Sequence, residues 1–394
     1  MRIGIYIDVL KRELRGIGYH VYELIHNLSM IDKENEYFLY YQCGALQKKN
    51  TVQSCQKALN LHLRPVRFPE VWFSNHPTLW WEYYLPLVIR MDRIDIFHGP
   101  NYFLPTIPRE KTIVTIHDLA FFKMELYPKG FTESLRYWTE KALHSAGRVI
   151  AISENSRQDI EALGIVEPER IRVIYGGGHV VPEEEIQYER IGEVYAVFKL
   201  PKKYILFIGV LHPRKNIPFL VRSYAKLKRD TALPHGLVLA GLRGPAAEEI
   251  EQLIQELGIS SDVIITGYVE DWQLPLLYKH ADLFVLPTLY EGFTLVTLEA
   301  MHYGVPVVAT ECSSIREGVG QAATLVPCDD IEAMIKAMHE LLIDDLLRQE
   351  RIALGKKQAA KFSWQNCASE TLNLYNEMYN LTVRPNLEVN PRLR

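Results

Sequence analysis

The stretch "ADLFVLPTLYEGFTLVTLEAMHYGVPVVAT" at residues 281–310 decides how the second half of the chain folds. It opens with an apolar run that ends at Pro287 and closes with the apolar run VPVVA at 305–309. Apolar runs that do not alternate with polar residues are typical of parallel strands buried on both faces. Between them, EGFTLVTLE places two glutamates around a turn and a helix. The expected order is strand, loop, helix, strand.

The same alternation of strands and helices extends along the whole chain. Apolar runs predict strands in the first half at 2–8, 37–42, 94–98, 112–117, 148–152 and 171–175. They predict strands in the second half at 204–209, 237–241, 262–266, 282–286, 305–309 and 323–327. Helical patterns lie between several of these runs, for example at 131–146 and 154–163. Two such series predict two doubly wound α/β domains, which suits a chain of 394 residues.

We place the first domain at residues 1–182 and the second at 200–362, with a polar, charge-rich linker at 183–199. Apolar residues make up 48% of the chain and charged residues 23%, a normal balance for a soluble globular protein. The net charge of −4 does not favour nucleic acid as a partner. Five cysteines without a C-x-x-C pair favour a reduced, cytoplasmic protein without a zinc site.

Ligands of open α/β sheets collect at the carboxyl ends of the strands, so the residues there are the candidates. In the second domain Arg214 and Lys215 follow one such strand and begin a helix, where an anion is favoured. Glu291 and Gly292 follow another, and Glu299 lies within the next helix. Carboxylates accept hydrogen bonds from paired sugar hydroxyls. Each candidate also has an interpretation without a ligand. Arg214 and Lys215 could form a solvated basic turn, Glu291 could be a charge at a helix N-terminus, and Glu299 could be a buried structural acid.

In the first domain the candidates are two glycines and two histidines. Gly16 and Gly18 open a helix after the first strand, but the third glycine of a dinucleotide fingerprint and a Walker A lysine are both missing. His98 and His117 each end a predicted strand. A turn cap is the favoured interpretation of His98, and His117 is equally compatible with a cap or a substrate contact. The sequence has no D-x-D and no Cys/His cluster, so we expect no metal.

These motifs resemble those of the retaining glycosyltransferases of family 4. "EGFTLVTLEAMHYGVPVVAT" looks like the family's E-x7-E signature with its following strand. "GVLHPRKN", "FHGPNYFLP", "VTIHDLAFF", "AISENSRQDI" and "LVLAGLRG" follow the family's order and spacing. The resemblance implies the GT-B fold, in which two Rossmann-like domains face each other across a cleft. It also implies that a closing helix at about 363–380 packs back on the first domain.

The resemblance further implies a role for each matching residue. Glu291 would hold the hydroxyls of the donor sugar, and Glu299 those of the nucleotide ribose. His117 would contact the donor sugar from the first domain, and Tyr268 would lie near the base. The groups that would bind the diphosphate are Arg214, Lys215, the loop at Gly16–Gly18 and the start of the helix at Gly292, Phe293, Thr294 and Leu295.

Four positions depart from the family pattern. Tyr19 and His20 stand where the family often has Arg and Tyr after the glycines, and "YGGGH" at 175–179 stands where an Asn-Gly pair is usual. Val210 and Gln321 replace a frequent Arg and Asp. These departures bear on the contacts with phosphate and on the connection between domains, and they leave the predicted reaction class unchanged.

The predicted enzyme is therefore a retaining, metal-independent glycosyltransferase without a cofactor. It would move a hexose from a GDP- or UDP-linked donor to a hydroxyl of a glycan, lipid-linked or small-molecule acceptor. A sugar-nucleotide epimerase, a non-catalytic sugar-nucleotide binder and a dehydrogenase are the alternatives. An epimerase would form a product without an acceptor, a non-catalytic binder would not turn over, and a dehydrogenase would bind a nicotinamide cofactor.

An aromatic stretch, "VWFSNHPTLWWEYYLP" at 71–86, raises the question of a membrane contact. Helical spacing groups Leu79, Trp80, Tyr83, Tyr84 and Leu87 on one face, which favours a core-facing helix. The alternative is that the loop before it, and Trp81, are exposed and meet the acceptor or a lipid surface. We expect at most a weak, peripheral contact with the inner face of a membrane.

Overall fold

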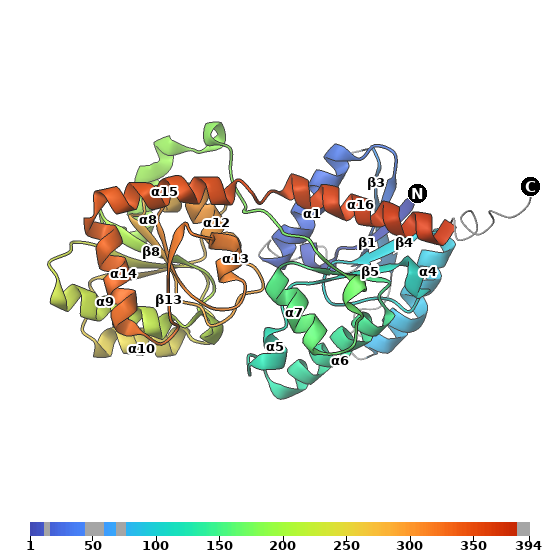
Figure 1. The fold of residues 1–394 in the computed structure, drawn as a ribbon, viewed down its shortest axis with the longest axis horizontal. Helices are drawn as coiled ribbons and strands as arrows, with labels where there is room; N and C mark the ends of the chain where they lie inside the picture. Colours follow the sequence, from blue (N-terminus) through green and yellow to red (C-terminus); the bar gives the residue numbers. More distant parts are fainter. Residues whose placement is uncertain (12–15, 44–58, 68–75, 384–394) are drawn as a thin grey trace, which may run out of the picture. The chain divides into compact units, whose positions relative to one another are not determined.

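The computed structural model describes residues 1–11, 16–43, 59–67 and 76–383. The chain divides into two compact units (Figure 1), of which unit 1 comprises Met1–Gly176 and Ser363–Arg394 and unit 2 comprises Gly177–Phe362. The segment 183–199, which the sequence predicts to be a linker, belongs to unit 2. It forms the helix α8 (Ile191–Phe198), whose Val194 is buried in the core of that unit.

Unit 1 is built on a seven-stranded parallel sheet with the strand order β3-β2-β1-β4-β5-β6-β7. Its strands are β1 (Arg2–Tyr6), β2 (Glu36–Cys43), β3 (Leu61–Arg67), β4 (Ile96–Gly99), β5 (Thr112–Ile116), β6 (Arg148–Ala151) and β7 (Ile171–Val173). Its α-helices are α1 (Ile17–Ile31), α4 (Leu85–Met91), α5 (Ala120–Lys123), α6 (Lys129–Ser145), α7 (Glu154–Ala162) and α16 (Trp364–Val383). Helix α16, which follows unit 2 in the chain, packs beside α1 in unit 1 (Figure 1).

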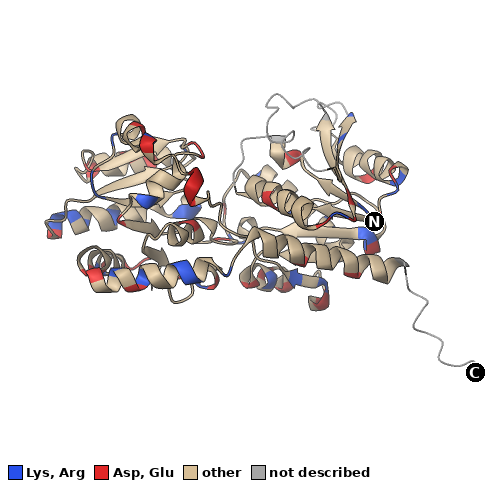
Figure 2. Ribbon diagram, turned by 90° about the horizontal axis from the view of Figure 1, so that it is seen from above, with Lys and Arg blue, Asp and Glu red and all other residues tan. Residues whose placement is uncertain are grey.

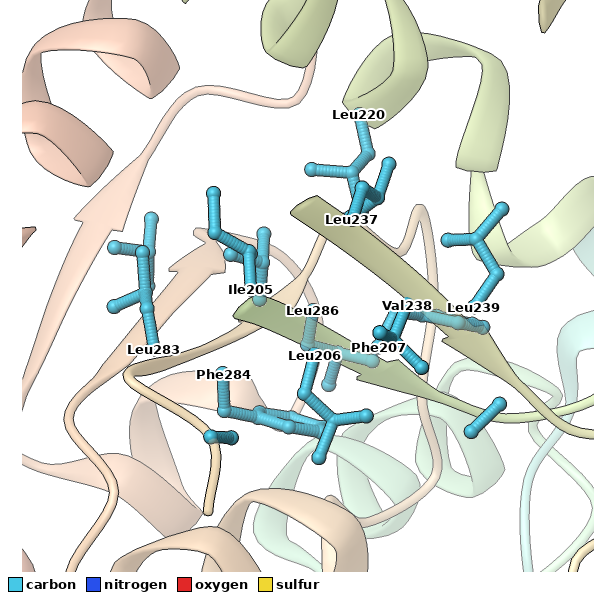
Figure 3. Packing of buried hydrophobic residues seen from close by; sticks show 14 of the residues in the cluster. Ile205, Leu206, Phe207, Leu220, Leu237, Val238, Leu239, Leu283, Phe284 and Leu286 are labelled. Atoms are coloured by element: carbon cyan, nitrogen blue, oxygen red, sulfur yellow. The ribbon is translucent and has the colours of Figure 1, made fainter. Parts of the chain in front are cut away.

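Unit 2 has a six-stranded parallel sheet with the order β10-β9-β8-β11-β12-β13. Its strands are β8 (Tyr204–Ile208), β9 (Gly236–Ala240), β10 (Val263–Gly267), β11 (Leu283–Leu286), β12 (Val307–Thr310) and β13 (Ala323–Val326). Besides α8, its α-helices are α9 (Ile217–Asp230), α10 (Ala247–Glu256), α11 (Leu274–Lys279), α12 (Leu295–His302), α13 (Ile315–Val319), α14 (Ile331–Ile343) and α15 (Asp345–Ala359). Apolar side chains of β8, β9 and β11 pack together in its core (Figure 3).

The apolar runs predicted the strands of both sheets except β3. That strand alternates apolar and polar residues and contains Pro65, and it lies at the edge of the sheet, where a proline is tolerated. Lys and Arg are interspersed with Asp and Glu along the helices of both units (Figure 2), as on an ordinary solvated surface. No helix among the described residues is long and apolar enough to span a membrane.

The prediction for the aromatic helix was wrong in detail. Leu79, Tyr83 and Leu87, expected on the buried face, expose 40%, 65% and 56% of their surface, whereas Trp80 and Trp81 are buried. The cause is the π-helical segment η3 (Leu79–Tyr84), after which the N–H of residue 85 still donates to the carbonyl five residues before it. This wider turn changes which residues share a face. The alternative that Trp81 is exposed was therefore also wrong. Of the predicted loop at 71–77, residues 71–75 lie outside the described residues.

Candidate functional site

The strand order of the unit 2 sheet reverses between β8 and β11, which makes this the point where a ligand is expected. Two loops leave the carboxyl ends of these strands. The first contains the short helix η8 (Pro213–Lys215), in which the side chain of His212 accepts a hydrogen bond from the backbone N–H of Arg214. It ends at Asn216, which has a left-handed backbone (φ +50°). The second runs from Pro287 to Thr294 and contains Glu291.

The structure brings together three of the predicted residues at this point. Arg214 donates from Nη1 to the Oε2 atom of Glu291 at 2.8 Å and to the carbonyl of Tyr290 at 2.6 Å. Lys215 donates from Nζ to the Oε1 atom of Glu291 at 2.5 Å. Each carboxylate oxygen of Glu291 therefore accepts from a different cation, and the cluster keeps a net charge of +1. Such a site favours an anionic ligand.

The electrostatics of this cluster fix the protonation state of Glu291. Burial alone would raise the pKa of its carboxyl group, but the charges and hydrogen bonds of Arg214 and Lys215 outweigh burial and lower the pKa to about 2. Glu291 is therefore ionised at any physiological pH. It can accept hydrogen bonds from hydroxyl groups, but it has no proton to give as a general acid.

Backbone and serine side-chain hydrogen bonds hold the two loops against each other and against a third. The N–H of Leu289 donates to the carbonyl of Arg214 at 2.9 Å, which joins the loops after β8 and β11. The N–H of Glu291 donates to Oγ of Ser313 at 2.8 Å, and Oγ of Ser314 donates to the carbonyl of Glu291 at 2.9 Å. The loop after β12 thus supports Glu291 on both sides of its peptide. This support leaves the carboxylate in a defined position.

The predicted phosphate-binding turn leads from Glu291 into helix α12. Gly292, Phe293 and Thr294 are buried, and Thr294 is the residue that precedes the helix. The helix begins at Leu295, and Thr297 donates from Oγ1 to the carbonyl of Thr294 at 2.9 Å. The start of α12 therefore follows the Glu291 loop directly, in the position that suits binding of a diphosphate.

Glu299 lies on α12 and has different partners from Glu291. Its Oε2 accepts from the hydroxyl of Tyr278 at 2.8 Å, and its Oε1 accepts from the backbone N–H of His179 at 3.1 Å. Burial raises the pKa of Glu299, and the charge of His179 and these two hydrogen bonds offset part of that rise. Glu299 therefore anchors the chain just after it enters unit 2.

The segment 175–179 departs from the family pattern, and steric crowding explains its glycines at 176 and 178. A Cβ atom added at Gly178 would lie 3.2 Å from Cγ of Glu299 and 3.4 Å from its backbone nitrogen. A Cβ atom added at Gly176 would lie 2.9 Å from Cη2 of Trp364. A side chain at either position would displace its neighbour, so the chain passes these points with glycine.

Tyr268, predicted near the base, follows β10 and is exposed.

In unit 1, His117 follows β5 and is buried. Its Nε2 atom lies 2.7 Å from the carbonyl of Pro100, and because a carbonyl only accepts, Nε2 carries the proton. Burial lowers the pKa of His117 to about 4 despite this bond, so the ring is neutral at physiological pH. Its Nδ1 atom is consequently an acceptor. A hydroxyl group could donate to it.

His98 is an interior residue, and the interpretation as a turn cap was wrong. It lies within β4, where its Nδ1 is 2.7 Å from the hydroxyl of Tyr375 and its Nε2 is 2.8 Å from Oγ1 of Thr115. The strand extends to Gly99, one residue further than the apolar run predicted. His98 therefore links α16 to the sheet rather than facing a ligand.

The two glycines at the start of α1 occupy different positions. Gly16 precedes the helix with φ +39°, a conformation that favours glycine, and no described atom lies within 4 Å of a Cβ built on it. Gly18 is buried in the first turn of α1.

Sequence reasoning missed the residues that support the site. Ser313 and Ser314 follow β12 at the same edge of the sheet as Glu291, so the rule on carboxyl ends could have found them. Tyr278, by contrast, lies in a short apolar helix where only the fold reveals that its hydroxyl meets Glu299.

Comparison with known proteins identifies the family. Residues 196–358 match the model described as Glycosyl transferases group 1, and residues 14–178 match the Glycosyltransferase Family 4 model. The "O-antigen chain mannosyltransferase B" of Escherichia coli is 32% identical over 386 residues, which span 95% of this chain and 99% of that relative. The chain therefore belongs to the family 4 glycosyltransferases, and it is an enzyme.

Two further matches bear on substrate and fold. The "Serotype-specific mannosyltransferase WbdA" of Escherichia coli is 31% identical over 281 residues, 69% of this chain but only 34% of the relative. The solved structure of Anabaena HepE in complex with UDP-glucose superposes with a TM-score of 0.71 at 18% identity, covering 96% of this chain and 100% of that one. This likeness shows the GT-B fold.

Proposed function

We propose that this enzyme transfers a mannosyl group from a nucleotide diphosphate donor to a hydroxyl of a growing glycan, with retention of configuration and without a metal ion. The full-length similarity to an O-antigen chain mannosyltransferase is the observation that carries the choice of sugar and acceptor. The cluster of Arg214, Lys215 and Glu291 at the switch point of unit 2 supports binding of the donor there. GDP-mannose is the donor that we expect.

In this proposal the cationic cluster makes the main electrostatic contribution to stabilising the transition state. As the bond between the sugar and the diphosphate breaks, negative charge grows on the leaving phosphate. Arg214 and Lys215 stabilise that charge, and the N-terminus of α12 adds its dipole. Two fixed cations supply the positive charge that a divalent ion would otherwise bring, which supports the independence from metal. Glu291 holds both cations in place and accepts from hydroxyls of the sugar.

The retaining outcome follows from attack on the same face of the sugar from which the phosphate departs. The acceptor oxygen bonds to the anomeric carbon, the bond from that carbon to the phosphate oxygen breaks, and the proton of the acceptor passes to the departing phosphate. Glu291 remains an ionised carboxylate beside its cations throughout, so it serves neither as acid nor as nucleophile. His117 accepts from a sugar hydroxyl through Nδ1.

The acceptor side of the proposal includes a weak contact with a membrane surface. Leu79, Tyr83, Leu87 and Met91 recur every four residues and expose 40%, 65%, 56% and 70% of their surface. The exposed Arg90 lies in the last turn of the same helix. An apolar stripe with a neighbouring cation suits shallow binding to an anionic lipid surface. At that surface the enzyme would reach a growing glycan that is carried on a lipid.

The test is a transfer assay with the purified protein. GDP-mannose, UDP-glucose and UDP-galactose are each offered with mannose-terminated oligosaccharides, in the presence and absence of EDTA, and the new linkage is assigned by NMR. We expect mannose transfer from GDP-mannose, a product with the anomeric configuration of the donor, and no loss of activity with EDTA. An inverted product refutes retention. A requirement for added Mg²⁺ or Mn²⁺ refutes metal independence, and transfer of another sugar refutes the choice of mannose.

A further inference from the structure

One buried ring touches both places where the chain crosses between the units. The chain leaves unit 1 after Gly176 and returns at Ser363. His20, on α1 and only 5% exposed, lies edge-to-face against Trp364, the first residue of α16, with ring centroids 5.2 Å apart. A Cβ atom on Gly176 would be 2.9 Å from the Trp364 ring and 3.6 Å from Nδ1 of His20. The three residues pack in one cluster.

The same ring also touches His117. The two imidazoles are perpendicular, with centroids 4.8 Å apart. The hydrogen bond from His117 to the carbonyl of Pro100 holds Nε2, and the ring of Tyr102 also packs edge-to-face against His117, with centroids 5.9 Å apart. The edge-to-face contact with His20 further restricts the orientation of the ring. His20 therefore contributes, together with Pro100 and Tyr102, to where the acceptor atom Nδ1 of His117 points.

We propose that His20 is a positioning residue for His117 and that it couples the orientation of the His117 ring to the chain at the two crossings. A movement of Gly176 or Trp364 displaces His20, and His20 turns His117. The inference rests on the proposed function in one respect, namely that His117 contacts the donor sugar. Burial, with a smaller contribution from the repulsion that a protonated His20 would meet from protonated His117 or His98, lowers the pKa of His20 well below its usual range. The contact therefore joins two neutral rings.

The first experiment measures steady-state transfer by three variants. His20→Leu has similar size but no flat ring, His20→Phe restores a ring, and His26→Leu is the control on the exposed side of the same helix. We expect His20→Leu to lower kcat roughly tenfold, with the affinity for the nucleoside diphosphate within about twofold of wild type. His20→Phe should recover most of the rate, and His26→Leu should match wild type. An unchanged kcat in His20→Leu overturns the proposal.

A double-mutant cycle separates positioning from general destabilisation. In a His117→Ala background, His20→Leu should cost nothing further, because the ring that it positions is gone. Gly176→Ala, which presses on Trp364, should show the same dependence on His117. If the losses multiply instead, His20 acts on the fold or on another step, and the proposal fails.

Histidine NMR tests the same link without activity. With the imidazoles labelled with ¹³C and ¹⁵N, the His117 signals are assigned by their loss in His117→Ala. They should shift or broaden in His20→Leu and in Gly176→Ala, and stay in place in His26→Leu. Signals of His117 that ignore both substitutions overturn the coupling. Signals that respond in a protein without transferase activity would instead show that the proposed function is at fault.

Discussion

Replacing Glu291 by Gln removes one negative charge from a buried site that holds two cations. The carboxyl group has a pKa of about 2 in the folded chain against an ordinary value of 4.5. A pKa difference of this size corresponds to about 3 kcal/mol of stability at pH 7, on the order of 1.4 kcal/mol per unit. Because the folded pKa is depressed, this stability is present above about pH 5 and is lost as the pH falls towards 2.

Gln behaves like the protonated carboxyl group at every pH, so the difference between wild type and Glu291→Gln depends on pH. It should be about 3 kcal/mol at pH 7 and roughly half of that at pH 3. Urea unfolding monitored by circular dichroism measures it, and hydrogen exchange of peptides from 283–302 localises it. Glu311→Gln is the matched control, since the Glu311–Arg316 pair is about half exposed and should contribute less than about 1 kcal/mol.

The same variant separates the two ligands of the site. Glu291→Gln leaves Arg214 and Lys215 in place, so calorimetry should show the affinity for the nucleoside diphosphate retained or increased, while sugar transfer falls steeply. Equal stability of the variant and wild type at pH 7, or a difference that does not shrink towards pH 3, would refute the role of the ion pairs. A collapse of diphosphate affinity would place Glu291 in the nucleotide site instead.

Three further predictions concern other parts of the molecule. Lys215→Ala should lower kcat/KM by an amount equivalent to about 2–4 kcal/mol in transfer assays, because it removes a charge that the leaving phosphate needs, and wild-type turnover would contradict this. Gly178→Ala should lower stability by roughly 1–3 kcal/mol in thermal unfolding through contact with Glu299, whereas Gly192→Ala, with open space around it, should not. Sedimentation with anionic vesicles should show weak binding that high salt and Leu87→Glu both abolish, and tight binding that ignores salt would speak against a peripheral contact.

Much of this fold could be predicted because its central strands are continuous apolar runs, a pattern that only burial on both faces explains. The edge strand β3 escaped because its outer face meets solvent and its sequence alternates. The buried face of the aromatic helix was predicted wrongly because a π-type turn changes the period of that face. The residue types alone do not indicate such a turn. His98 escaped because its partner Tyr375 lies 277 residues away.

The candidate site, too, could be predicted from the sequence only in part. Arg214, Lys215 and Glu291 could be grouped from sequence, since each follows a strand end at one edge of the sheet. That Glu291 pairs with both cations could not be predicted, because the pairing depends on how the loops at 209–216 and 287–294 are held together by backbone hydrogen bonds. The anchoring role of Glu299 likewise depends on Tyr278 and on the path of the chain after Gly178.

Unit 1 is completed by a helix that follows unit 2 in the chain, and this order has a consequence during synthesis. The first 176 residues leave the ribosome well before α16, separated from it by the 186 residues of unit 2. At elongation rates of about 5–20 residues per second this delay is roughly 10–40 s. Throughout it, α1 lacks its partner helix and His98 lacks Tyr375. The nascent first unit therefore waits with an apolar face uncovered, and a chaperone that shields such faces should bind it until α16 emerges.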